Sequence, residues 1–161
     1  MTKVTFAQTN LKEYQAGHIF YVSLPEYMGR TVGLNAASII QYKNAVKDVY
    51  GFIIEDNKEE LALAELNYSS INEFFEGFIT GFLKDEEKRT VSTPKFQKKG
   101  DISFAECDIT YFDKDANADI YYLVGIVETK SAFYKVLSWS TVENKERYKA
   151  DFQKIVYSLR D

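Results

Sequence analysis

The chain has 161 residues, of which 45% are hydrophobic and 16% aromatic, and its formal net charge is −4. This length suits one domain with a single core, and the apolar content excludes an intrinsically disordered chain. The mildly acidic balance gives no electrostatic reason to bind nucleic acid or anionic lipid, and no apolar run reaches the roughly 18–20 residues of a membrane span.

The N-terminus carries part of a secretory signal pattern. Thr5-Phe6-Ala7 followed by Gln8 is typical of a cleavage site, whereas the basic and apolar parts of a signal are missing. We interpret residues 1–17 as an N-terminal extension, a candidate remnant of a signal segment, and residues 18–161 as a single domain. A lost signal would place the protein in the periplasm or outside the cell; otherwise the protein is cytoplasmic.

Strands are predicted in the first third of the chain. Residues 18–24 are rich in β-branched and aromatic side chains and stop at Pro25. Residues 37–46 and 49–56 form two further candidate strands, and the short link between them indicates a hairpin.

An amphipathic helix is predicted from Ser70 onward, where Ser70 and Glu73 have the spacing of a capping box. Apolar residues then recur with the helical period at Ile71, Phe74, Phe75, Phe78, Ile79 and Phe82. Gly77 and Gly81, four residues apart, would let this helix approach a sheet closely. A shorter helix is predicted just upstream, over residues 59–66.

A meander of strands is predicted after residue 95. A short strand over residues 95–98 precedes three longer ones over residues 102–112, 119–128 and 132–139. In the first long strand, Glu106 and Asp108 alternate onto one face, which indicates a partly exposed edge.

The last predicted helix begins near Ser140 or Thr141, where Ser140 and Glu143 have the spacing of a second capping box. The order is therefore strands, helix, strands, helix. Two amphipathic helices each need a surface to cover, so the pattern predicts an α+β protein of the α/β/α sandwich type, with a central, mostly antiparallel sheet and helices on both faces.

Three stretches carry a family resemblance: "FYVSLPEYM" at residues 20–28, "SINEFFEGF" at 70–78, and "AFYKVLSWST" at 132–141, which leads to a helix ending in "IVYSLRD". With this order of elements, the chain resembles the PsbP-like, or Mog-like, α/β/α sandwich family. That family includes the photosystem accessory protein PsbP, the Ran-binding Mog proteins and bacterial proteins of unknown function, including DcrB-type lipoproteins. The resemblance implies an accessory, assembly or binding module without a characteristic catalytic set.

Catalytic and cofactor motifs are scarce. His18 is the only histidine and Cys107 the only cysteine, so multi-histidine zinc sites and histidine-based triads are excluded. Phosphate-binding loops and nucleophile elbows are missing from the sequence. Cys107 lies in mid-strand and is predicted to be a core residue. We therefore expect no enzyme activity and no cofactor.

An acidic stretch between two predicted strands has the spacing of calcium ligands, at Asp113, Asp115, Asn117 and Asp119. An EF-hand loop would need glycine at its sixth position and glutamate at its twelfth, where this chain has Ala118 and Val124. Aspartate and asparagine are also usual turn residues. We favour a solvated hairpin turn and keep weak calcium binding as the alternative.

Aromatic residues are the remaining signal, because tyrosine and tryptophan dominate protein–protein contacts. The candidates for contact with a partner are Tyr27, Met28, Arg30, Tyr121, Tyr134 and Trp139. The leading hypothesis is a non-enzymatic module that presents an aromatic surface or groove to a protein partner. The alternative is a carrier of a small apolar ligand, with a pocket between sheet and helix.

Overall fold

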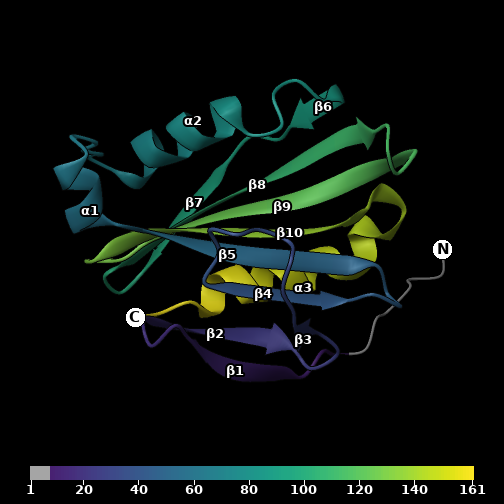
Figure 1. Cartoon of the computed structure of the whole chain (residues 1–161), viewed down its shortest axis with the longest axis horizontal. Helices are drawn as coiled ribbons and strands as arrows, with labels where there is room; N and C mark the ends of the chain where they lie inside the picture. Colours follow the sequence, from purple (N-terminus) through teal and green to yellow (C-terminus); the bar gives the residue numbers. More distant parts are fainter. Residues whose placement is uncertain (1–7) are drawn as a thin grey trace.

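A large antiparallel sheet organises the computed structural model, which describes residues 8–161 (Figure 1). Its strand order is β3-β4-β5-β10-β9-β8-β6, and β7 also pairs with β8. These strands are β3 (Gly29–Arg30), β4 (Ile40–Asn44), β5 (Val49–Asn57), β6 (Glu87–Val91), β7 (Lys95–Lys99), β8 (Ile102–Asp113), β9 (Ala118–Glu128) and β10 (Ala132–Thr141). The predicted hairpin β4–β5 and the meander β8–β9–β10 are both present.

Helices cover both faces of this sheet, as Figure 1 shows for α2 (Ile71–Gly81) and α3 (Lys145–Ser158). Side chains alternate along β8, β9 and β10, so that one set packs with α3 and the other with α2. Tyr121 and Leu123, for example, belong to the α3 side, and Val124 and Ile126 to the α2 side. The predicted α/β/α sandwich is therefore confirmed.

Helix α2 starts where the sequence predicts. The Ser70 hydroxyl accepts a hydrogen bond from the Glu73 amide at 3.3 Å. The Glu73 carboxylate reaches back to the amide and hydroxyl of Ser69 rather than to Ser70. These bonds hold the pKa of Glu73 below its usual value, because they favour the ionised carboxylate.

Helix α3 starts differently from the prediction. A short 3₁₀ turn, Val142–Asn144, precedes it, and neither Thr141 nor Asn144 provides a side-chain cap. The Ser140 hydroxyl donates to the Thr141 carbonyl and accepts no bond from the Glu143 amide, so the predicted second capping box is wrong.

Close packing of helix on sheet occurs at Gly125, not at the glycines of α2. A Cβ built on Gly125 would overlap Cγ2 of Val156 and lie 2.9 Å from its Cγ1. A Cβ on Gly77 would meet only the Tyr68 ring at 3.7 Å, and one on Gly81 would meet nothing within 4 Å. The prediction that Gly77 and Gly81 bring α2 close to the sheet is wrong, because a Cβ at either position would meet no atom of the sheet within 4 Å.

Two predicted features of β8 also need correction. Because β6 and β7 pair with β8 on its outer side, β8 is not an edge strand. Glu106 is only 6% exposed and accepts hydrogen bonds from Gln153 and Tyr157 of α3. Asp108 binds the ammonium of Lys149 at 2.8 Å. Both carboxylates therefore anchor α3 rather than face solvent.

A second, two-stranded sheet consists of β1 (Leu11–Ala16) and β2 (Phe20–Pro25). Ala16, Phe20, Val22 and Leu24 pack into the α3-side core. Residues 11–16 therefore belong to the fold, and the prediction that residues 1–17 form an N-terminal extension is wrong for these six. The signal-like Thr5-Phe6-Ala7 lies outside the described residues. Within residues 8–161 we find no helix long and apolar enough to span a bilayer.

Candidate functional site

An open groove runs along one flank of α2, between that helix and strands β5 and β10. It encloses a cavity of about 490 Å³. We call it the α2 groove; its apolar lining consists of Leu61, Leu66, Tyr68, Phe74, Phe78 and Phe82, and its other lining residues are Asp56, Gly77, Gly81 and Lys135. Six apolar side chains around one open cavity are typical of a binding site.

The groove follows from the way the sequence places phenylalanines and glycines on α2. Phe74 and Phe75 are buried against the sheet, whereas Phe78 and Phe82 lie half-buried on the flank. Gly77 and Gly81 stand beside them and have no side chains to fill the space. The wide apolar face of the helix is therefore only partly covered, and its uncovered part forms one wall of the groove.

Helix α1 (Lys58–Leu63) and the segment after it form the other wall. Asn57 caps α1 by accepting from the amides of Glu59 and Glu60. Leu61 faces the groove, and Leu66 is 50% exposed at its rim. Leu63, on the same short helix but outside the groove lining, is 87% exposed. This wall therefore presents apolar surface to solvent.

One ion pair interrupts the apolar lining. The ammonium of Lys135 lies 3.0 Å from Oδ2 of Asp56. The same ammonium lies 5.3 Å from the centre of the Phe78 ring and 5.9 Å from that of Phe74. Such cation–π contacts hold a lysine against aromatic rings. The groove lining is thus apolar except for this one ion pair, whose two charges cancel.

A row of aromatic rings continues from the groove across the sheet. The Phe82 ring meets Tyr122 edge-on, with centroids 5.4 Å apart. Tyr122 stacks on Trp139 at 5.0 Å, and Trp139 stacks on Tyr50 at 5.6 Å. The last three are direct cross-strand neighbours on β9, β10 and β5. Since Tyr122, Trp139 and Tyr50 are all half-buried, the row is partly open to solvent.

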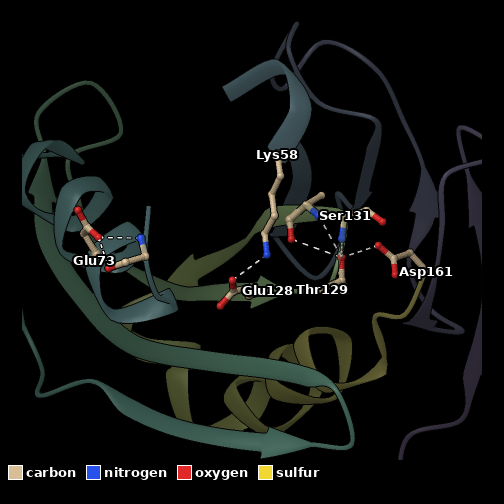
Figure 2. Close-up of polar contacts among 8 residues, drawn as sticks. Lys58, Glu73, Glu128, Thr129, Ser131 and Asp161 are labelled. Carbon is tan, nitrogen blue, oxygen red and sulfur yellow. Dashed lines mark hydrogen bonds and ion pairs between the residues drawn. The ribbon is translucent and has the colours of Figure 1, made fainter. Parts of the chain in front are cut away.

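The turn between β9 and β10 is fixed from two sides, as Figure 2 shows. On one side Lys58, the first residue of α1, binds Glu128 at 2.8 Å and donates its amide to the Ser131 carbonyl. On the other side the Thr129 hydroxyl donates to Asp161 at 2.6 Å and accepts from the Ser131 amide. These bonds hold α1 in place, and with it one wall of the α2 groove.

The structure does not support three of the predicted contact residues. Met28, Tyr121 and Tyr134 are all buried in the α3-side core. The Tyr121 hydroxyl donates to Asp108 at 2.6 Å and the Tyr134 hydroxyl to Asp161 at 3.0 Å. Burial, reinforced by these bonds, raises the pKa of both tyrosines. These hydroxyls are occupied by the carboxylates of half-buried Asp108 and exposed Asp161, and the tyrosine rings are covered by the core.

The other three predicted contact residues do not lie together. Trp139 belongs to the aromatic row on the α2 side. Tyr27 packs at the edge of the α3-side core and donates its hydroxyl to Asp151 at 2.6 Å. Arg30 is exposed on the short edge strand β3. Of these three, only Trp139 belongs to the aromatic row, which reaches the α2 groove through Tyr122 and Phe82.

The acidic stretch after β8 forms a hairpin turn. Oδ1 of Asp113 accepts from the amides of Asp115 and Ala116, and Asn117 has a left-handed backbone with φ of 51°. In the part of the chain that the structure describes, no group of three or more His, Cys, Asp or Glu side chains is placed to hold a metal ion. Calcium binding by Asp113, Asp115, Asn117 and Asp119 stays a prediction.

Cys107 is buried among the α2-side core residues, as predicted. Burial raises the pKa of its thiol to about 12. A thiol with so high a pKa carries almost no thiolate near neutral pH, so it is a poor nucleophile.

Sequence reasoning missed the α2 groove. Phe78 and Phe82 are recognised as part of the apolar helix face, but the pattern does not reveal that the sheet covers only part of that face. The sequence feature that indicates the groove is the pair Gly77 and Gly81 beside these phenylalanines, because glycines leave the space next to the aromatic rings unfilled.

Comparisons with known proteins place the fold. No protein-family model and no curated protein sequence matches the chain. Among solved structures, the solution structure of cyanobacterial PsbP (CyanoP) from Synechocystis sp. PCC 6803 matches with a TM-score of 0.65 and 10% identity, covering 99% of this chain and 97% of that one.

Two further structures match over most of their length. LpqN of Mycobacterium tuberculosis, which is involved in cell envelope biogenesis, has a TM-score of 0.59 and 9% identity over 95% of this chain and 91% of that one. A protein of unknown function from Pseudomonas aeruginosa, PA94, has a TM-score of 0.53 and 7% identity over 89% of this chain and 91% of that one. The chain therefore has the PsbP-like fold, as its sequence pattern predicts.

Proposed function

We propose that this chain is a non-enzymatic binding or assembly module that holds an apolar segment of a protein partner in the α2 groove. The observation that carries the proposal is the groove itself, an open aromatic cavity of about 490 Å³ continued by the row of Tyr122, Trp139 and Tyr50. The proposal applies the sequence hypothesis of an aromatic surface or groove to this cavity.

The chemistry of the groove supports a protein segment as the occupant. Aromatic side chains provide large contact areas with few rotatable bonds, which is why they dominate protein–protein contacts. Half-buried Phe78 and Phe82, together with exposed Leu66, form apolar surface that a partner could cover. The openness of the groove along α2 suits an elongated occupant.

A display selection tests the proposal. A library of random peptides is selected on the wild-type protein, and the enriched peptides are then measured against the variant Gly77→Gln. Glutamine is a far better helix former than glycine, so this variant should keep the fold while its side chain fills the groove. Enriched peptides should be rich in apolar residues and should lose binding to the variant.

The matched control is Thr80→Gln, which places the same side chain on the exposed part of α2 that does not line the groove. This control should keep full peptide binding. Equal binding by wild type and Gly77→Gln would overturn the proposal.

A carrier of a small apolar ligand is the second candidate, and the cavity volume favours it. A volume of about 490 Å³ lies within the roughly 300–1,000 Å³ of small-molecule sites, and the cavity lies between sheet and helix. Native mass spectrometry of protein purified from its source organism tests whether the chain carries such a ligand. A bound apolar small molecule that is lost in Gly77→Gln supports the carrier, and protein without such a molecule contradicts it.

A further inference from the structure

A second surface is the unpaired side of strand β7, which has the properties of a strand-pairing edge. In the strand order of the sheet, β7 is separated by β8 and β9 from β10, which borders the α2 groove. Strand β7 pairs with β8 through Lys95 opposite Glu106, Phe96 opposite Ala105 and so on to Lys99. On its other side, no strand in residues 8–161 pairs with it. All five residues of β7 are exposed. An unpaired strand leaves a row of backbone amides and carbonyls able to accept another extended chain.

The edge is positively charged in a protein of negative net charge. Lys95, Lys98 and Lys99 are three of the five residues of β7, which contains no acidic residue. None of the three makes an ion pair with any residue in the range 8–161. Their charges are therefore available to an incoming partner.

The two faces of β7 differ in chemistry. Phe96 lies opposite Ala105, on the α2 side, where its ring meets Phe75 edge-on at 6.0 Å while it remains 43% exposed. Lys98 shares the face of Phe96, whereas Lys95, Gln97 and Lys99 alternate onto the other face. A strand added beside β7 would place alternate side chains next to these two environments, because directly opposite residues share a face.

Lysines at an edge also discourage unwanted pairing, and this decides which partner fits. A second copy of the chain pairing β7 with β7 would bring like charges together, which is destabilising. The neighbouring edge strand β6 is irregular, with a shift of register between Glu87 and Thr90 and a left-handed backbone at Lys88. On this side of β8, regular pairing with an added strand is therefore confined to β7, and the charge of β7 favours a strand of opposite charge.

We propose that β7 is a docking edge for an extended segment of a protein partner in which acidic and apolar residues alternate. The acidic residues lie beside Lys95 and Lys99, and the apolar residues lie beside Phe96. Backbone hydrogen bonds supply the affinity and the alternation supplies the specificity, as in other cases of strand addition. This surface is independent of the α2 groove.

A titration with designed peptides tests the proposal. A six-residue peptide alternating glutamate and valine is added to isotope-labelled protein, and backbone amide shifts and hydrogen exchange are followed by NMR. The amides of residues 95–99 should shift and become protected. A peptide of the same composition with three glutamates followed by three valines should bind at least about tenfold more weakly, since it loses cross-strand pairs.

Charge reversal provides the matched comparison. The double variant Lys95→Glu/Lys99→Glu should bind the glutamate–valine peptide at least about tenfold more weakly and should gain binding to a lysine–valine peptide. The control Lys12→Glu/Lys43→Glu has the same net charge but alters β1 and β4, so it should bind as the wild type does. The gain of binding by the first variant cannot result from unfolding.

Three outcomes would overturn the proposal. The first is the lack of any change at residues 95–99 at millimolar peptide. The second is equal weakening by the control variant, which would indicate a general charge effect. The third is equal binding by a glutamate–valine peptide methylated on alternate backbone nitrogens, because that peptide keeps its charges but cannot complete the strand pairing.

Discussion

Replacing Gly125 with alanine should force α3 away from the sheet. Gly125 lies in the middle of β9, directly under Val156 of α3. The added methyl group would overlap Cγ2 of Val156 and lie 2.9 Å from Cγ1 and 3.2 Å from Cβ. Real Cβ atoms do not approach other carbons so closely, so helix or strand must move.

Overpacking of this kind costs about 1–3 kcal/mol. The variant Val156→Ala removes the obstructing methyl groups from a side chain that is 1% exposed, and on its own should cost roughly 2 kcal/mol in lost burial. In the double variant the new methyl group occupies part of the space that Val156 vacates. We therefore expect the double variant to be about 1–2 kcal/mol more stable than the sum of the two single effects predicts.

Urea denaturation followed by fluorescence of Trp139, the single tryptophan, measures these free energies of unfolding. A neutral Gly125→Ala variant, or strictly additive effects in the double variant, would refute the reasoning that α3 docks through this glycine.

Three further predictions concern helix α2, the buried tyrosines and the acidic turn. Gly77→Ala should raise the free energy of unfolding by about 1 kcal/mol, because alanine is the better helix former and its methyl group meets only ordinary contacts; urea denaturation that shows a loss would contradict this. Alkaline pH should unfold the protein, because burial raises the pKa of Tyr42, Tyr121 and Tyr134 above the ordinary 10.0. Their contribution to the free energy of unfolding is fully present below about pH 10 and falls above it by about 1.4 kcal/mol per pH unit for each tyrosine, because the unfolded chain loses these protons first. Absorbance at 295 nm, which reports tyrosine ionisation, and circular dichroism, which reports unfolding, should therefore change together. Tyrosine ionisation without unfolding would contradict this. Millimolar calcium should leave the melting temperature unchanged, because Asp113 already accepts two backbone amides of its own turn; a clear rise would restore the calcium hypothesis.

The predicted elements that were correct have strong periodic patterns. The strands 102–112, 119–128 and 132–139 were located to within two residues, because apolar and aromatic side chains run through them on both faces. The α2 helix was equally clear from its 3.6-residue period. In contrast, β1 and β6 were missed: "LKEYQA" and "EKRTV" are largely polar, and backbone pairing at a sheet edge leaves little trace in the sequence.

The sequence pattern also does not predict which individual tyrosines are buried. In a sheet covered on both faces, alternation does not distinguish a covered side chain from an open one. Tyr121 and Tyr134 lie under α3 and find their carboxylate partners at Asp108 and Asp161, 13 and 27 residues away in the sequence. Trp139 alternates onto the α2 side, where coverage ends.

Calorimetric titration of one selected peptide into the wild-type protein, Gly77→Gln and Thr80→Gln tests most directly whether the α2 groove is the binding site. The account predicts that Gly77→Gln binds at least about tenfold more weakly, a loss of about 1.4 kcal/mol or more, while Thr80→Gln binds like the wild type. Equal affinity for all three proteins would contradict the assignment of the groove as the partner site.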